Sequence, residues 1–293
     1  MLSERGSAER FMRRFTLTDD SYSLALFTDD QLQYLADHPD AAIHVDTTFN
    51  ISKKPTNMYA LITTIRACEF KGDPLLLGPI LLTTRRRERD YAVLWQEIIG
   101  REPRLCKLNT FVTNGEEAMI KSIQGCFTDL YLVRCMIHLN DNCRSKAREF
   151  LLPPRIIDTV MKSISDLVMA KRVEFDALAE EAIKQWTVSA LAEKVGDKMG
   201  KFIKYFRRQV LPVLLPNLQD SLELAGVNVV QRNNNPAESM NAKVKRNITS
   251  GEKVDKICQE LKIMALAQTE EMRKASRNLS HVFVKKVEVS SVD

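Results

Sequence analysis

Hydrophobic and β-branched residues alternate with polar ones along three consecutive stretches of the chain. These stretches are residues 41–51 (AAIHVDTTFNI), 57–69 (NMYALITTIRACE) and 75–84 (LLLGPILLTT). Alternation is typical of β-strands, and the short connections predict an antiparallel meander. The residues before them, 1–40, predict a short helical lead-in, because "TDDQLQYLADHP" begins with a cap-like Asp and ends with His-Pro.

After the meander, helical and strand patterns take turns. Helical spacing covers 86–101, 115–127 and 136–151, and strand patterns cover 105–113 and 129–135. The order β-β-β-α-β-α-β-α predicts an α/β fold with a mixed five-stranded sheet flanked by helices. This is the order of the RNase H-like fold, and it places the core at residues 41–152.

A long helical block follows the core. Residues 153–230 contain amphipathic segments at 155–171, 173–185 and 188–210, which predict an all-helical insertion. The polar stretch "QRNNNPAESMNAKVKR" then predicts a turn and a new helix with Pro236 in its first turn, so a core helix is expected within 231–250. A final helix is expected at about 252–276, within a C-terminal segment of residues 251–293 that ends in a tail.

Composition narrows the class of protein only a little. The chain has 293 residues, of which 44% are hydrophobic and 28% charged, as in ordinary globular proteins. It has no apolar run of membrane-spanning length and no signal-peptide core near Met1, so we expect an intracellular protein without membrane contacts. The six cysteines include no Cys-x-x-Cys pair, and we expect them to be reduced.

The net charge of +5 permits nucleic-acid binding without requiring it. Two groups of basic residues are candidates for contacts with DNA phosphates. The first is Arg85, Arg86 and Arg87, a run that also suits a nuclear import signal or a solvated helix start. The second is Lys243, Lys245 and Arg246, which share a predicted helix with Glu238 and would form a basic rim beside an acidic centre.

Asp46 lies in the middle of the first predicted core strand. His44, Asp46 and Thr48 share one face of that strand. A carboxylate in a central strand is costly unless it is paired or binds a metal, and a salt-bridged or edge-exposed Asp is the simpler alternative.

Two further residues complete a candidate metal site with Asp46. Asn114 ends the fourth predicted core strand, which neighbours the first in an RNase H-like sheet, so we expect it beside Asp46. Glu238 lies in the first turn of a later helix and joins them if that helix packs on the sheet. Three acidic side chains of this kind hold two Mg²⁺ or Mn²⁺ ions for phosphodiester cleavage, and here one of the three is neutral.

Four blocks of the chain, "HVDTTFNIS", "FVTNGEEAM", "LVRCMIHLNDNCRSKA" and "NNNPAESMNAKVKR", resemble the transposase domain of Mutator-like elements (the MULE family of DDE transposases). They occur in family order over residues 40–250. The resemblance implies an RNase H-like core with a helical insertion, and catalytic, metal-binding positions at Asp46, Asn114 and Glu238. It also implies that Cys135 and His138 correspond to a Cys-x-x-His element of the family.

The main departure from the family is Asn114, which stands where the family has Asp. An amide keeps one oxygen ligand but loses the charge, so we expect Mg²⁺ or Mn²⁺ to bind weakly or not at all. Asn-Gly is also a good turn dipeptide, which is an ordinary reason for this residue. Glu116 and Glu117 are close enough in sequence to be substitutes, although compensation of the helix dipole explains both.

Two other features have competing interpretations. Cys135 and His138 could belong to a zinc site, but such a site needs four ligands, and a buried thiol with a packing histidine is at least as good an explanation. Trp186 could stack on an unpaired base or belong to the core of the helical block.

The sequence therefore predicts a domesticated or decayed MULE-type transposase that binds DNA and has lost most strand cleavage. One alternative is an active DNA transposase in which Asn114 serves as a neutral ligand. Another is a regulatory or protein-interaction module built on the same core. The partner expected is DNA, in the nucleus, and a homo-oligomer is an open alternative.

Overall fold

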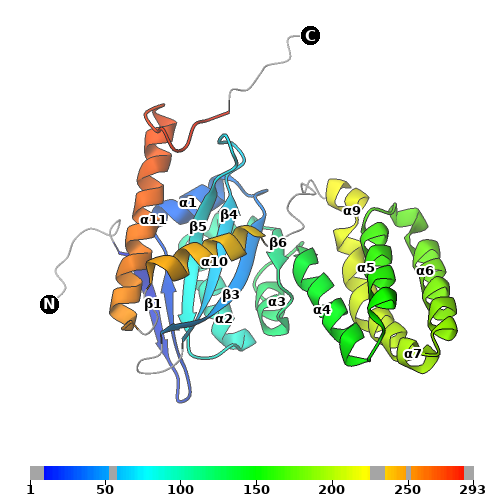
Figure 1. The fold of residues 1–293 in the computed structure, drawn as a ribbon. Coiled ribbons are helices and arrows are strands. Elements are labelled where there is room, and N and C mark those ends of the chain that lie inside the picture. The colour runs from blue at the N-terminus through cyan, green and yellow to red at the C-terminus, as the bar shows by residue number, and fades with distance from the viewer. Residues whose placement is uncertain (1–9, 53–57, 225–234, 249–251, 287–293) are drawn as a thin grey trace, which may run out of the picture. The chain divides into compact units, whose positions relative to one another are not determined.

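The structure is a computed structural model that describes residues 10–52, 58–224, 235–248 and 252–286 (Figure 1). The chain divides into two compact units. The first comprises residues 1–111, 116–130 and 235–293, and the second comprises residues 112–115 and 131–234.

The chain forms a seven-stranded mixed sheet with the strand order β1-β2-β5-β4-β3-β6-β7. The strands are β1 (Met12–Leu17), β2 (Tyr22–Leu26), β3 (Ile43–Ser52), β4 (Met58–Arg66), β5 (Leu75–Thr83), β6 (Thr110–Thr113) and β7 (Tyr131–Arg134). Both the β3–β4 and β4–β5 pairs are antiparallel, which confirms the predicted meander. The neighbours β3 and β6 are the first and fourth strands of the expected core.

The predicted helical lead-in is wrong for residues 12–26, which form an antiparallel hairpin. Leu17 pairs with Tyr22, and the turn between them is closed by a hydrogen bond of 2.8 Å from the Thr18 N–H to the Ser21 carbonyl. Strand β2 then pairs with β5, far away in sequence, so the pairing that attaches this hairpin to the sheet is not local. Within residues 10–40, the described part of the lead-in, α1 (Asp29–Asp37) is the one helix, and the sheet has seven strands rather than five.

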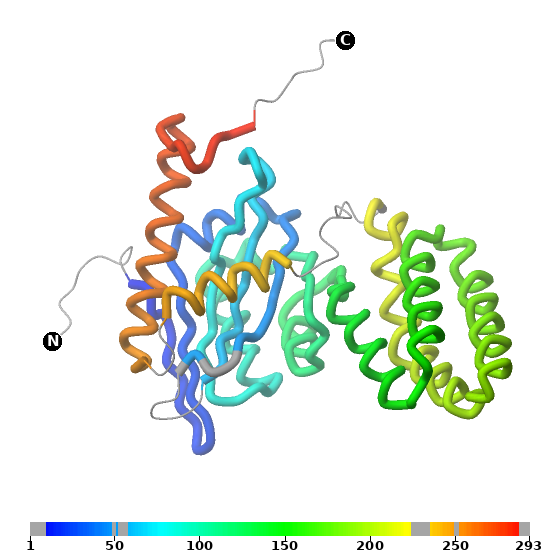
Figure 2. Tube along the Cα trace, viewed as in Figure 1, coloured from blue at the N-terminus to red at the C-terminus, as the bar shows by residue number. Residues whose placement is uncertain are grey.

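Helices α10 (Asn235–Asn247) and α11 (Val254–Ser276) cover one face of the sheet, as Figures 1 and 2 show. Their buried side chains share a hydrophobic cluster with β4 and β5, which includes Ala60, Ile62, Ile80, Leu82, Met240, Val244, Ile257 and Leu261. The predicted turn at Asn233 and Asn234 lies outside the described residues. The expectation that the helix carrying Glu238 packs on the sheet is confirmed.

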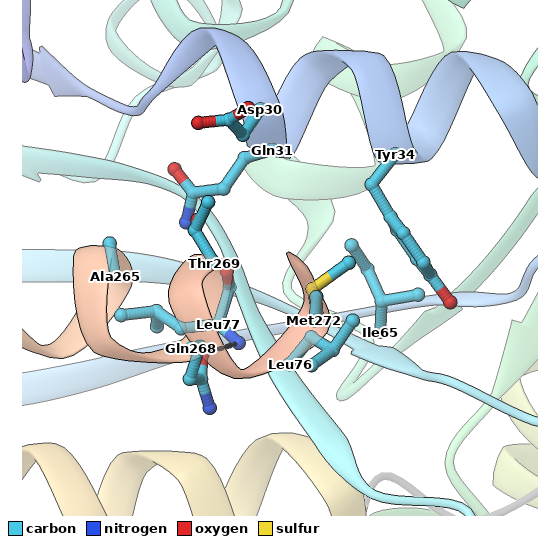
Figure 3. Close-up of a pocket in the computed structure, with 10 residues that line it drawn as sticks. All are labelled: Asp30, Gln31, Tyr34, Ile65, Leu76, Leu77, Ala265, Gln268, Thr269 and Met272. Carbon is cyan, nitrogen blue, oxygen red and sulfur yellow. Dashed lines mark hydrogen bonds between the residues drawn. The ribbon is translucent and has the colours of Figure 1, made fainter. Parts of the chain in front are cut away.

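A small cavity lies where α1 and α11 meet the start of β5 (Figure 3). Side-chain amides fix this junction: Gln31 donates to the Leu77 carbonyl at 2.6 Å, and Gln268 accepts from the Leu77 N–H at 2.7 Å. The cavity volume of about 30 Å³ is of the order of one water molecule. It is therefore a packing feature of the junction, too small for an organic ligand.

Helices α2 (Glu88–Arg101) and α3 (Glu117–Gln124) pack on each other, and Trp95 of α2 contacts Ser122 of α3 and two rings outside both helices. The Trp95 ring meets Phe111 and Phe127 edge-on, each at 5.8 Å, and its indole N–H donates to the Ser122 hydroxyl at 3.0 Å. A short 3-10 turn (Pro103–Lys107) precedes β6, so the predicted strand at 105–113 is shorter than expected.

The second unit contains β7 and a helical block with its own core. Its helices are α4 (Met136–Glu149), α5 (Pro154–Val168), α6 (Arg172–Ala192), α7 (Gly196–Tyr205), α8 (Leu211–Leu214) and α9 (Gln219–Leu224), with a π-helical turn at Phe206–Val210 and a 3-10 turn at Leu215–Asn217. The break expected between 185 and 188 is absent, since no helix-breaking residue occurs there. This unit also contains α4, which precedes the predicted insertion at 153–230, because Leu139 and Cys143 of α4 belong to the same core as α5 and α6.

Among the described residues, no helix is both long enough and apolar enough to span a bilayer. The chain after α11 forms an isolated antiparallel bridge between Phe70 and Lys285. Residues 287–293, the rest of the predicted tail, lie outside the described residues.

Candidate functional site

Asp46 occupies the middle of β3 and is only 7% exposed. Both of its carboxylate oxygens accept hydrogen bonds. Oδ1 accepts from the backbone N–H of Thr47 at 2.9 Å, and Oδ2 accepts from the side-chain amide of Asn241 at 2.7 Å. These two donors offset part of the cost of burying the carboxylate, and they fix its orientation.

Helix α10 brings Asn241 to Asp46. Pro236 lies in its first turn, and the buried side chains of Ala237, Met240 and Val244 hold the helix on the sheet. Asn241 follows Glu238 by three positions, so the two side chains lie one turn apart on the same side of α10. Glu238 is half-buried and lies one helical turn before Asn241, the residue that binds Asp46.

Asn241 has a second feature that bears on metal binding. Because a carboxylate only accepts, the amide nitrogen of Asn241 must face Asp46. Its Oδ1 is then buried, and it accepts no hydrogen bond from any residue in the described part of the chain. A buried amide oxygen beside a carboxylate is the hard donor that Mg²⁺ prefers. Asp46 and Asn241 therefore offer oxygen atoms of the kind that this ion takes as ligands.

Asn114 directly follows β6, the strand next to β3 in the sheet. It is half-buried, and Gly115 after it has a φ of +87°, which confirms the predicted turn. Asn114 belongs to the second compact unit, whereas Asp46 and Glu238 belong to the first. Of the three predicted metal ligands, Asp46 and Glu238 therefore lie in the same compact unit.

Neither Glu116 nor Glu117 is a substitute for Asn114 next to Asp46. Glu116 accepts from the Thr47 hydroxyl at 3.1 Å and from the Tyr91 hydroxyl at 2.9 Å. Thr47 points to the face of β3 opposite Asp46, because successive side chains alternate. Glu117 is exposed and pairs with Lys121 at 2.7 Å.

Burial, with the neighbouring Glu116 carboxylate, raises the pKa of Tyr91 far above its usual range. Its phenol therefore remains a hydrogen-bond donor to Glu116 at neutral pH. The Thr47–Glu116–Tyr91 group is a structural network that joins β3 to α2.

Models of known protein families give no match to this chain, and curated protein sequences give none either. What the site does follows from its own geometry and chemistry.

Arg85, Arg86 and Arg87 all have partners within the first unit. Arg87 pairs with Asp20 and with Asp90, the latter at 2.7 Å. Arg86 lies 3.8 Å from Glu116 and 5.4 Å from the centre of the Tyr59 ring.

Arg85 donates to the Asp20 carbonyl at 3.2 Å. The hydrogen bond from Arg87 also holds the pKa of Asp20 at about 2. The basic run thus has a local structural role at the start of α2, and contact with DNA remains a prediction.

The three cations of α10 are exposed but do not share one face. Lys245 follows Glu238 by seven positions, two helical turns, and lies on the same side. Lys243 and Arg246 instead line a groove of about 640 Å³ between α10 and α11. Of the three, Lys245 is therefore best placed for a phosphate near Glu238.

Cys135 and His138 are placed at the start of α4. Cys135 is fully buried, and its N–H donates to the Thr113 carbonyl at 2.8 Å. His138 lies one turn later and is half-buried. This geometry supports a local structural element that fixes α4 to the end of β6, and zinc binding remains untested.

Trp186 belongs to the core of the second unit. It is fully buried, its indole N–H donates to Ser163 at 3.1 Å, and its ring meets Phe206 edge-on at 4.9 Å. A buried indole is not available to stack on a base, so the packing interpretation is confirmed.

Two functional candidates escaped sequence reasoning. Asn241 has a sequence signal, its spacing of three from Glu238, which places it on the same side of the helix. Arg134, described below, has none, because its environment is made by residues distant in the chain.

Proposed function

We propose that this protein derives from a MULE-type transposase, binds DNA through an RNase H-like core, and carries a degenerate two-metal site at Asp46, Asn114 and Glu238. The observation that carries the proposal is the bond between Asp46 and Asn241. It lies one helical turn from Glu238, on a helix that the resemblance assigns to the third acid.

The strand order supports the RNase H-like assignment. Five of the strands lie in the order β5-β4-β3-β6-β7. When these core strands are numbered along the chain from β3, the order becomes 3-2-1-4-5. Asp46 then lies on strand one, and Asn114 follows strand four. The hairpin β1–β2 extends this sheet beyond β5. The helical block of the second unit lies between β7 and α10 in the chain, where the family's insertion is expected.

The residues account for a loss of catalysis. Bound Mg²⁺ or Mn²⁺ would activate a nucleophile and stabilise the leaving oxygen of a phosphodiester. Asp46 is preoriented by its two donors, and Glu238 can supply a second carboxylate. Asn114 supplies an amide oxygen without charge, which weakens ion binding relative to Asp. We therefore propose DNA binding with little or no strand cleavage, in a protein that acts in the nucleus.

Calorimetry with Mg²⁺ and Mn²⁺ tests the proposal on freshly made protein, checked by mass for deamidation of Asn114. The variants are wild type, Asn114→Asp, and Asn114→Asp combined with Asp46→Ala. Glu117→Gln is the matched control, because it removes an exposed carboxylate outside the site. We expect metal binding by Asn114→Asp and its loss on removal of Asp46.

Three outcomes separate the alternatives. Binding by wild type as tight as by Asn114→Asp, together with metal-dependent nicking, would establish an active transposase instead. Failure of every variant to bind metal would contradict the two-metal ancestry. Absence of salt-dependent DNA binding would favour the regulatory or protein-interaction module.

A further inference from the structure

The guanidinium of Arg134 lies directly against Gly115, the residue after Asn114. A Cβ atom placed on Gly115 would stand only 1.4 Å from Cζ of Arg134. The arginine thus fills the space that a side chain at position 115 would need. Gly115 is required here both for this contact and for its φ of +87°.

The backbone of Arg134 is fixed at the end of β7. Its N–H donates to Oδ1 of Asn217 at 3.0 Å, and its carbonyl accepts from Nδ2 of the same amide at 2.5 Å. Asn217 is fully buried and bonds the strand as a neighbouring strand would. The side chain of Arg134 therefore starts from a rigid point and is held over the Asn114–Gly115 turn.

The positive charge of Arg134 has no acidic partner in the described part of the chain. The guanidinium makes no ion pair there, and its buried Nε has no hydrogen-bond acceptor there. The titratable groups that act on it are Cys135, Cys143 and Tyr205. Burial raises the pKa of both Cys143 and Tyr205 to about 12, so both are neutral at physiological pH.

A half-buried cation without a counter-charge is unfavourable unless an anion completes it. Arginine is suited to phosphate because its planar fork donates two parallel hydrogen bonds. Asn114 is the residue before the glycine that the guanidinium covers. An Asp at position 114 would instead repel a phosphate and attract Arg134 to itself.

We infer that Arg134, held at the turn that carries Asn114, forms a phosphate-binding point for the backbone of a nucleic acid, independent of metal. Asn114 then has a positive role, since it removes a carboxylate that would compete for the arginine. This inference rests on the proposed function for its ligand, and it depends on no metal ion. The resemblance assigns position 114 to a metal ligand, and in this protein the turn at that position would bind the phosphate without a metal.

The test is binding of a duplex oligonucleotide by the full chain in EDTA, followed by fluorescence anisotropy at several salt concentrations. We compare wild type with Arg134→Gln, Arg134→Lys and Asn114→Asp. Arg155→Gln is the matched control, because it removes an exposed arginine from α5 of the same unit. Thermal melts of every variant establish that it is folded.

We expect Arg134→Gln to lower the affinity about tenfold and to reduce the salt slope by roughly 0.9, the value for one phosphate contact. Asn114→Asp should weaken binding to a similar extent, because the new carboxylate pairs with Arg134. A further variant that combines Arg134→Gln with Asn114→Asp should bind no more weakly than Arg134→Gln alone. Arg134→Lys keeps the charge and should retain the salt slope while losing part of the affinity.

Several outcomes would overturn the inference. One is wild-type affinity in folded Arg134→Gln, and another is unchanged or tighter binding by Asn114→Asp in EDTA. If Arg134→Gln does not fold, Arg134→Lys and Asn114→Asp decide the question.

Inorganic phosphate is titrated at constant ionic strength as a separate arm. Binding of phosphate by wild type that equals that of DNA would identify a free-anion site and contradict the nucleic-acid ligand. Failure of the metal experiment above would leave these predictions intact, so the two proposals can fail separately.

Discussion

The side-chain amide of Asn241 donates a 2.7 Å hydrogen bond to Oδ2 of Asp46 across a separation of 195 residues. This bond joins the central strand β3 to α10, and it lies entirely within the first compact unit. Because both side chains are buried, the bond contributes to stability and also holds the carboxylate in one orientation.

Replacing Asn241 should destabilise the fold and disturb the site together. Asn241→Ala leaves Oδ2 of Asp46 without its donor, and we expect a loss of about 2 kcal/mol in the free energy of unfolding. Chemical denaturation measures the loss. Asn247→Ala is the control and should change stability by much less, because its amide makes only exposed hydrogen bonds among the described residues, to the Lys243 carbonyl at 3.1 Å and the Met264 sulfur at 3.5 Å. Equal effects of the two variants would contradict the role given to Asn241.

Asn217 should be essential for the second unit to keep β7 in place. Its amide bonds both the N–H and the carbonyl of Arg134, so Asn217→Ala removes two partly buried hydrogen bonds. We expect a loss of about 2–3 kcal/mol in the free energy of unfolding. Asn217→Asp keeps only the acceptor and should be at least as damaging, because it also buries a charge. Stability within error of wild type for either variant would count against this assignment.

Alkaline pH should destabilise the second unit through Cys143. Burial raises its pKa to about 12 in the folded protein, from an ordinary value of 9.0. The stabilisation is complete below pH 9 and is lost as pH rises towards 12, because the unfolded thiol releases its proton first. The slope for one proton is about 1.4 kcal/mol per pH unit. Tyr205 of the same unit, whose pKa is also raised to about 12, adds to the effect at the upper end.

The measurement is urea denaturation of wild type and Cys143→Ala between pH 7 and 11. The variant should lose less stability over this range, since the buried thiol is gone. Cys106→Ser replaces an exposed cysteine and should follow wild type. Parallel curves for all three proteins would show that the Cys143 thiol does not contribute.

The basic residues should separate into those that bind DNA and those that hold the fold. Lys245→Ala removes an exposed cation on the Glu238 side of α10, and we expect weaker DNA binding with a salt slope lower by about 0.9. Arg87→Ala should leave that slope unchanged and lower the melting temperature, because Arg87 pairs with Asp20 and Asp90. A lower salt slope for DNA binding by Arg87→Ala would instead show that the basic run Arg85–Arg87 contacts DNA.

The sequence by itself determined the elements with strong periodicity. The meander β3–β4–β5 follows from period-two alternation, and α10 follows from Pro236 and the apolar spacing of Ala237, Met240 and Val244. Asp46 stood out because a carboxylate in a central strand needs a partner, and Glu238 because the resemblance places the third acid there; α10 does pack on the sheet as expected.

Only the tertiary structure decided which long-range partners these residues have. The hairpin β1–β2 was missed because it is attached to the sheet through the pairing of β2 with β5. Asn241 and Arg134 gained their importance from Asp46 and from Gly115, residues that folding brings to them. The physical reason is common to all three. Local pattern sets the period of a segment, whereas the energy of a buried polar group depends on whatever partner the fold places beside it.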